Sequence, residues 1–389
     1  MQNNSKSFSL FSIYFLGFLF SLNVALTAYI DSSFLKNFIS GELVGSIFTV
    51  TYIFVILGYF LMPFVLRKYG NFKISIFLII IELLTLTGLA VFSPSFWLVF
   101  LVMLNLISSY LIYLSIDIFL ENYSDNRQTG VLRGIYLTGI NLAWVLSQVI
   151  SGTLLIDNNY QNVYFTSSMV LAPVFFILLF GLRNFKDSNY EVPAVWQTIK
   201  TVWANKNIFN IFMSNFLLYF FYAWMIIYMP LYLNENLGYS WLEIGKIFFV
   251  MLLPFVFIQY PLGYLADKKW GEKEILSVGF ILMAITTGII SFISDGNLIL
   301  WAVILFLTRI GAGMVEVMCS AYFFKKVDSF NVNIISFFRM SGPLAFIFGS
   351  LFATILLNSF SFDIKYLFLI LGLLMFLGLK FSLSLQDTR

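Results

Sequence analysis

Histidine is absent from this chain of 389 residues, cysteine occurs once, as Cys319, and charged residues make up only 11% of the total. Without histidine the chain lacks the commonest metal ligand and general base of proteins. A single cysteine excludes an internal disulfide and a zinc site of the cysteine type. The formal charge of +3 gives no electrostatic support for nucleic-acid binding. We therefore expect no nucleic-acid partner, no metal and no cofactor, and proton chemistry has to rest on carboxylates.

Apolar side chains dominate the composition, with 60% hydrophobic residues and 47 phenylalanines. A soluble domain carries roughly 25% charged residues, so this composition indicates a lipid bilayer as the main surroundings. Apolar runs of about 20 residues, bounded by charges and turn residues, predict an all-α membrane protein of twelve transmembrane helices. The predicted spans are 8–30, 42–66, 74–93, 95–120, 133–156, 161–183, 207–233, 240–266, 275–294, 296–322, 333–358 and 362–384.

The basic residues test this count, because cytoplasmic loops of membrane proteins carry an excess of lysine and arginine. With the N-terminus inside, 17 of the 22 basic residues are cytoplasmic, Lys36 and Lys365 fall outside, and Lys246, Arg309 and Arg339 lie within spans. A miscounted span would invert all later loops and remove this bias. We expect both termini in the cytoplasm and a plasma-membrane location, of the bacterial inner-membrane kind.

The two sets of six spans resemble each other at a shift of 200 residues. The second span begins VGSIF at 44–48 and the eighth begins IGKIF at 244–248. Such a repeat predicts two pseudo-symmetric six-helix bundles, at 1–183 and 207–389. The polar stretch 184–206 between them is expected to be a cytoplasmic linker. Whether it forms an interfacial helix or a solvated tether stays open at this point.

A loop motif connects this pattern to a known family. Residues 263–273, GYLADKKWGEK, resemble the motif G-x-L-A-D-[RK]-x-G-[RK]-[RK] of the major facilitator superfamily, between spans eight and nine. A degenerate copy, PFVLRKYG at 63–70, lies between spans two and three. Two departures stand out: one extra residue precedes the glycine of the second copy, and Glu272 occupies a usually basic position.

The resemblance implies a fold of two six-helix bundles and a conformational latch formed by the motif residues, which are Gly263, Asp267, Lys268, Gly271, Arg67 and Gly70. In the family this latch stabilises one access state. We expect Asp267 to contact the start of span five, near Arg127 or Arg133. Arg67 would meet a positive helix end at the start of span eleven, so the two latches should be unequal.

Charged groups within spans are functional candidates by default, because they cost several kcal/mol in hydrocarbon. Glu316 and Glu82 are the proton-coupling candidates. Arg309 lies seven residues before Glu316 and so shares its helix face, and Arg339 lies in span eleven. The alternative for Glu316 is a fixed ion pair that holds spans ten and eleven together.

Uncharged polar side chains repeat at helical spacing in several spans. The resemblance implies that spans one, four, seven and ten line a central cavity, with two, five, eight and eleven beside them. The candidate cavity residues are Asn23, Thr27, Asn105, Tyr113, Asn141, Gln148, Asn215, Tyr219, Tyr222, Gln259, Arg309 and Arg339. The alternative for each is a hydrogen bond between helices, worth about 0.6 kcal/mol on average.

Together these patterns predict a monomeric secondary active transporter, not an enzyme, that moves a small solute by alternating access. No phosphate-binding G-x-x-x-x-G-K-[ST] loop is present, so an ion gradient, with the proton as a hypothesis, or the solute itself would supply the energy. The substrate stays open between a drug-like amphiphile for export, an anion and a lipid. A non-transporting membrane sensor and a membrane-embedded enzyme are the alternatives from other classes.

Overall fold

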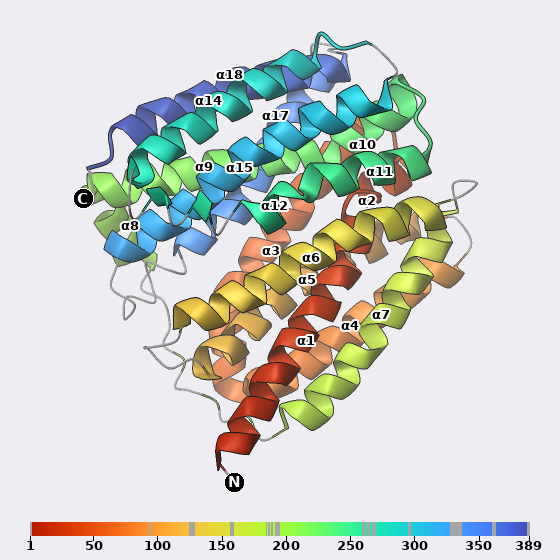
Figure 1. Ribbon diagram of the computed structural model, residues 1–389. Helices are drawn as coiled ribbons and strands as arrows, with labels where there is room; N and C mark the ends of the chain where they lie inside the picture. Colours follow the sequence, from red (N-terminus) through yellow and green to blue (C-terminus); the bar gives the residue numbers. More distant parts are fainter. Residues whose placement is uncertain are drawn as a thin grey trace. The chain divides into compact units, whose positions relative to one another are not determined.

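The computed structural model is built of helices throughout its described part (Figure 1). It describes residues 2–386 apart from 93–94, 124–128, 156–158, 184, 186, 188–189, 191–194, 259–260, 263–264, 267–269, 295–296, 327–336 and 360–362. No strand occurs among these residues. The all-α fold predicted from the apolar runs is confirmed.

The described part of the first half contains seven helices. They are α1 (Gln2–Ala28), α2 (Asp31–Lys36), α3 (Gly41–Tyr69), α4 (Asn71–Val91), α5 (Trp97–Tyr123), α6 (Thr129–Leu154) and α7 (Tyr160–Gly181). The second half begins with the short helix α8 (Val195–Ala204). It continues with α9 (Lys206–Ile227), α10 (Met229–Leu231), the π-helical turn η2 (Tyr232–Asn236), α11 (Trp241–Leu252), α12 (Pro254–Phe257), α14 (Glu272–Ile290), α15 (Leu298–Lys326), α17 (Ser341–Ser359) and α18 (Ile364–Leu383).

Eleven helices in the described part are long and apolar enough to cross a membrane. The twelfth predicted span that is missing from this count is the eighth along the chain, 240–266. Its described part contains the shorter helices α11 and α12. The division falls at Pro254, which lacks the backbone N–H that a continuous helix would use at this position. Hydropathy therefore located the span, while the proline interrupts the helix within it.

Two compact units make up the chain. Unit 1 comprises Met1–Gly41 and Ile53–Val192, and unit 2 comprises Glu42–Tyr52 and Pro193–Arg389. The predicted domain limits of 1–183, 184–206 and 207–389 stay predictions.

The same helix pairings recur in both halves. In the first half α1 packs against α5, α6 and α7, while α4 packs against α5 and α7. In the second half α9 packs against α15, α17 and α18, while α14 packs against α15 and α18. Each of these helices in the first half makes the same contacts as the helix six spans later in the second half. The predicted pseudo-symmetric repeat is thus visible in the packing as well as in the sequence.

The turn before the third span of each half shows how the repeat accommodates its extra residue. Gly70 precedes α4 with φ +80°, and Gly271 precedes α14 with φ +83°, a left-handed region that favours glycine. The N–H of Gly70 donates to the carbonyl of Leu66, four residues back, at 2.8 Å. The N–H of Gly271 donates to Ala266, five residues back, at 3.1 Å. The extra residue is therefore taken up as a single π-type turn.

Small residues bring α14 and α15 into close contact. A Cβ on Gly311 would lie 2.8 Å from the carbonyl oxygen of Gly279 and 2.9 Å from the backbone nitrogen of Met283. No side chain fits between these backbones, so the pair of glycines sets the separation of the helices.

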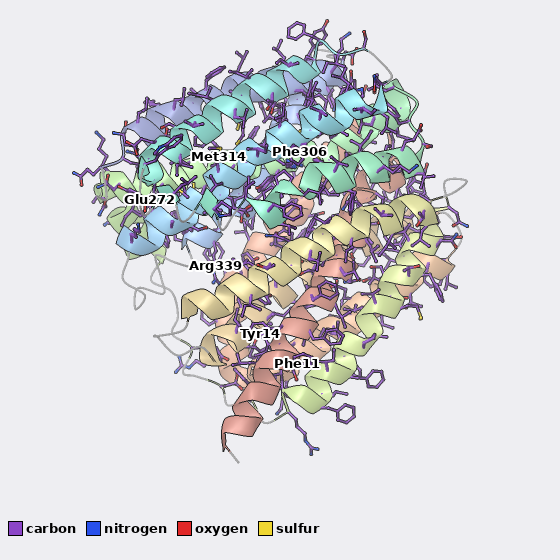
Figure 2. All side chains as sticks on the ribbon, viewed as in Figure 1. Phe11, Tyr14, Glu272, Phe306, Met314 and Arg339 are labelled. Carbon is purple, nitrogen blue, oxygen red and sulfur yellow. The ribbon has the colours of Figure 1, made fainter. Side chains whose placement is uncertain are left out.

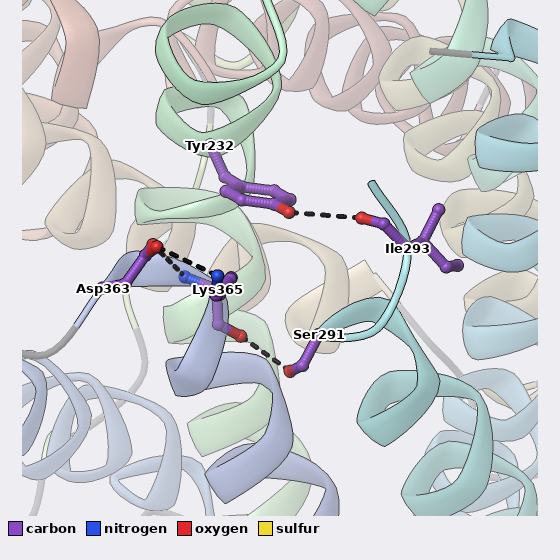
Figure 3. A network of polar contacts seen from close by, with 5 residues as sticks. All are labelled: Tyr232, Ser291, Ile293, Asp363 and Lys365. Atoms are coloured by element: carbon purple, nitrogen blue, oxygen red, sulfur yellow. Dashed lines mark hydrogen bonds and ion pairs between the residues drawn. The ribbon is translucent and has the colours of Figure 1, made fainter. Parts of the chain in front are cut away.

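The ends of η2, α14 and α18 are joined by a network of polar contacts (Figure 3). The hydroxyl of Tyr232 donates to the carbonyl of Ile293 at 3.5 Å, and the hydroxyl of Ser291 donates to the carbonyl of Lys365 at 2.7 Å. Asp363 accepts a hydrogen bond from the N–H of Lys365 at 3.1 Å and caps α18. These bonds satisfy backbone groups that would otherwise be exposed at the helix ends.

Candidate functional site

The polar face of α15 carries the candidate coupling group of unit 2. Glu316 accepts a hydrogen bond at Oε2 from the hydroxyl of Tyr222 on α9, at 3.3 Å. Arg309 lies two turns earlier on α15 and is only 1% exposed. Its Cζ is 5.6 Å from the centroid of the Tyr222 ring and 5.1 Å from that of Phe221. Tyr222 therefore contacts both charged groups, one through its ring and the other through its hydroxyl.

Aromatic rings surround this group. The rings of Tyr219 and Tyr222 are 5.8 Å apart, edge to face, and Phe255 of α12 lies 6.3 Å from Tyr222. Tyr219, Tyr222 and Glu316 are half-buried, whereas Arg309 is fully buried behind them. The cluster thus combines aromatic rings, a hydroxyl and a carboxyl on half-buried residues with the buried positive charge of Arg309.

Two further predicted residues of unit 2 lie near the α9–α17 contact. The side-chain amide of Asn215 donates to the hydroxyl of Ser341 at 2.7 Å, which joins α9 to the start of α17. Arg339 precedes α17 and is half-buried (Figure 2). Arg339 lies in the candidate span Phe337–Asn358 and Asn215 in the span Lys206–Asn236. Their cavity role stays a prediction.

The second candidate carboxyl, Glu82, lies at the middle of α4 and is fully buried. Its Oε1 accepts hydrogen bonds from the amide of Asn23 on α1, at 2.9 Å, and from the hydroxyl of Ser109 on α5, at 2.8 Å. The hydroxyl of Ser167 on α7 donates to the Asn23 side-chain oxygen at 2.5 Å. Four helices of unit 1 therefore meet at this carboxyl.

Several predicted cavity residues of unit 1 have partners inside the bundle. Asn105 donates to Thr85 at 3.4 Å, and the hydroxyl of Tyr113 donates to Ser21 at 3.3 Å. Gln148 donates to the carbonyl of Trp144 and the hydroxyl of Ser147 on its own helix. Thr27 donates to the carbonyl of Val24, also on its own helix. Asn141 is half-buried on α6. These contacts are of the interhelical and local kinds, so the cavity assignment stays a prediction for each residue.

Three residues of the predicted latch, Gly263, Asp267 and Lys268, lie outside the described residues, and so does the predicted cavity residue Gln259. The expected contact of Asp267 with the start of span five is therefore not described. Arg67 is exposed at the end of α3, and Gly70 and Gly271 occupy the turns given above.

Two polar contacts at these turns were not foreseen from the sequence. In unit 1, the backbone N–H of Asn71 donates to Asp187 at 2.6 Å, so a residue of the linker caps α4. In unit 2, Glu272 begins α14 (Figure 2) and is buried. It forms an ion pair with Lys325 near the end of α15. This pair accounts for the acidic residue at a usually basic position.

Asp31 at the start of α2 is a further buried acid that sequence analysis did not list. It is 1% exposed and accepts a hydrogen bond from the hydroxyl of Tyr164 at 2.8 Å. The predicted first span ends at residue 30, whereas the candidate span of the structure runs Leu10–Lys36 and includes Asp31. Acids within spans are rare and have partners.

Comparisons with known proteins agree with the motif. The family model described as Major Facilitator Superfamily matches residues 7–333. A search of curated proteins found no match.

Proposed function

Because the chain belongs to the Major Facilitator Superfamily and is therefore a multi-pass membrane transporter, we propose that it is a secondary active transporter driven by protons. It would carry a small solute by alternating access between two related bundles. The observation that supports the coupling is the cluster of Glu316, Tyr222 and Arg309 inside unit 2. We found no arrangement of polar groups among the described residues that supports an enzymatic role.

Glu316 is the group that we assign to the proton. When ionised, its charge is balanced by Arg309, with which it interacts electrostatically. When protonated, it leaves Arg309 as a net positive charge. Proton binding therefore changes the charge of the site by one unit, and a solute that interacts with Arg309 would sense that change. Glu82 is the second proton-coupling candidate.

An amphipathic or aromatic solute fits this site best. The half-buried residues Tyr219, Tyr222 and Phe255 would offer flat apolar faces, and the carboxyl and hydroxyl would offer polar contacts. Export of drug-like amphiphiles is therefore the favoured direction, with lipid flipping on the same fold as the alternative. An anionic solute would have to compete with two aromatic rings for Arg309.

The other candidate residues complete the proposal. Asn215, Arg339 and the polar side chains of spans one, four and five would line or support the solute pathway. We further propose a monomer in the plasma membrane with both termini in the cytoplasm.

The test has two steps. A thermal-shift screen of the purified protein against a panel of amphiphiles identifies a stabilising solute. Proteoliposomes containing a pH-sensitive dye then report proton movement when that solute is added. Wild type should move protons with the solute, and Glu316→Gln should abolish the proton signal.

Asp363→Asn provides the matched control, because Asp363 is an exposed carboxylate paired with Lys365 away from the cluster. It should behave as wild type. Solute transport by the wild-type protein without any proton signal would exclude the proposed coupling.

A further inference from the structure

Aromatic rings from three helices of unit 2 meet at one place. The ring of Trp203, at the end of α8, lies 5.2 Å from that of Phe209 on α9. The Phe209 ring lies 6.3 Å from that of Phe381, near the end of α18. Helix α8 packs against α9, and α9 packs against α18 (Figure 1). We call this place the α8–α9–α18 corner. Trp203 is 68% exposed there, so its indole is available to a partner outside the protein.

Hydrogen bonds fix the backbone of the α8–α9–α18 corner. The side-chain amide of Asn207 donates to Oε1 of Gln386 at 2.8 Å, and the N–H of Gln386 donates to the Asn207 side-chain oxygen at 3.1 Å. The carbonyl of Gln386 accepts from the hydroxyl of Tyr322 at 2.9 Å, and that of Ser384 accepts from the amide of Asn210 at 3.4 Å. The residues after α18 are thus held against α9 and α15, and a ligand would meet a preformed surface.

Three lysines give the corner a positive charge. Lys200 lies one helical turn before the tryptophan on α8, Lys206 begins α9, and Lys380 directly precedes the phenylalanine of α18. All three are exposed, and none forms an ion pair within the described part of the chain. Neither 195–212 nor 364–386 contains an aspartate or a glutamate. The helices that form the corner therefore contribute no negative charge to it.

The adjoining start of α14 does not neutralise these lysines. The hydroxyls of Ser277 and Ser382 are 2.8 Å apart, which brings the first turns of α14 to the end of α18. Those turns carry Lys273 and Glu274, whose charges cancel, and Glu272 is buried in the ion pair described above. The net charge of the corner is positive, and an anionic partner complements it.

An apolar stripe on α18 leads away from the corner. Leu373, Leu377 and Lys380 are exposed and follow one another at spacings of four and three residues, so they share one side of this spanning helix. A lysine at the end of such a stripe keeps its ammonium group at the level of the lipid headgroups. A lipid can therefore place an acyl chain along the leucines and its headgroup beside the lysine. A water-soluble acidic partner would leave the stripe unused.

We propose that the α8–α9–α18 corner binds the headgroup of an anionic phospholipid, through Trp203, Phe209, Phe381, Lys200, Lys206 and Lys380. The lysines attract the negative headgroup, and the exposed indole occupies the boundary between headgroup and acyl chain. A neutral bilayer would be enough for the tryptophan, whereas the three lysines without acidic partners favour an anionic lipid. The proposal does not depend on proton-driven transport, because neither Glu316 nor Arg309 belongs to the corner.

The test compares two brominated lipids as quenchers of Trp203 fluorescence in proteoliposomes of the full chain. Brominated phosphatidylglycerol or brominated phosphatidylcholine is added, at the same small mole fraction, to bilayers that otherwise contain phosphatidylcholine. The chain has 8 tryptophans, so the signal of Trp203 is the difference between wild type and Trp203→Phe. We expect phosphatidylglycerol to quench this signal about three times as strongly as phosphatidylcholine, or more. The excess should fall as NaCl is raised, because salt screens exposed charges.

Two variants locate the effect. The triple variant Lys200→Gln/Lys206→Gln/Lys380→Gln should lose the excess quenching by phosphatidylglycerol and keep the quenching by phosphatidylcholine, since the indole still lies in the bilayer. Lys365→Gln is the matched control, because Lys365 is an exposed lysine at the opposite end of α18. It should keep the excess of the wild type.

Equal quenching of Trp203 by the two lipids would overturn the proposal, and so would an excess that persists in the triple variant. Quenching by neither lipid would place the corner away from the bilayer and equally overturn it. If the triple variant does not reconstitute, the NaCl series on wild type decides, and an excess that salt leaves unchanged contradicts the proposal. Failure of this test leaves the proton assignment of Glu316 intact, since that is read from proton flux.

Discussion

The hydroxyl of Tyr222 donates to Oε2 of Glu316 across 3.3 Å, and the ring of the same tyrosine lies against the Arg309 guanidinium. One side chain therefore contacts both an acid and a buried cation. In the proposed mechanism the carboxyl exchanges its proton while Arg309 stays in place.

Tyr222→Phe should weaken the coupling of proton movement to solute transport while the packing of the site is kept. The ring, and hence the contact with Arg309, is kept, while the hydrogen bond to Glu316 is lost at a cost of about 0.5–1.5 kcal/mol. We expect fewer protons moved per solute, measured in proteoliposomes with simultaneous solute and pH readouts. Tyr232→Phe is the control, because its hydroxyl bonds only weakly to Ile293. An unchanged proton-to-solute ratio in Tyr222→Phe would contradict the assignment.

Gly311→Ala should destabilise the protein by about 1–3 kcal/mol. The new Cβ would lie 2.8 Å from the Gly279 carbonyl oxygen and 2.9 Å from the Met283 nitrogen, and backbone atoms cannot rotate away. Chemical denaturation in detergent measures the change. Gly288→Ala on α14 meets nothing within 4 Å and should be neutral or slightly stabilising. Equal effects of the two substitutions would show that close packing does not set the spacing of α14 and α15.

The Glu272–Lys325 pair should couple more strongly than an exposed pair. Glu272 is 2% exposed, and Lys325 is 45% exposed, so solvent screens one partner only. A double-mutant cycle with Glu272→Gln and Lys325→Met should give a coupling free energy above about 1 kcal/mol.

Asp363 and Lys365 supply the comparison, since both are largely exposed and their charged atoms are 3.4 Å apart. Exposed pairs contribute roughly 0.2–1 kcal/mol. A smaller coupling for the buried pair than for this one would show that Glu272 is held by other contacts.

Trp203 should lie in contact with lipid. It is 68% exposed at the end of α8, its ring lies 5.2 Å from that of Phe209, and Lys200 and Lys206 are exposed on either side. Tryptophan with flanking lysines is typical of the membrane interface. In brominated lipids, wild type should lose more fluorescence than Trp203→Phe. The fully buried Trp301 serves as the control, and equal quenching in wild type and Trp203→Phe would favour a solvated tether.

Hydropathy and charge were sufficient to predict the spans, because each span needs a run of about 20 apolar residues and such runs are typical of membrane helices. The division at Pro254 was not predicted, since a proline in a span can bend a helix or interrupt it. The linker contact of Asp187 with α4 was also missed, because a single distant contact leaves no periodic pattern.

The candidate site was predictable as a list of residues but not as a set of partners. Helical spacing correctly placed Arg309 and Glu316 on one face of α15, and the tyrosine between them comes from α9. Asn23 was assigned to a cavity from its span, whereas the structure bonds it to Glu82. Spacing shows which residues share a face, and only packing shows which helix that face meets.

The π-type turn before α14 has a consequence for comparing the two halves. The extra residue changes their offset from 200 to 201, and α5 and α15 begin 201 residues apart. At this offset the counterpart of Glu82 is Met283, and that of Arg309 is Ser108. The duplicated scaffold thus carries a carboxyl among hydroxyls in one copy and a guanidinium among aromatic rings in the other. The two copies therefore share their helix pairings and differ in the ionic chemistry that each contains.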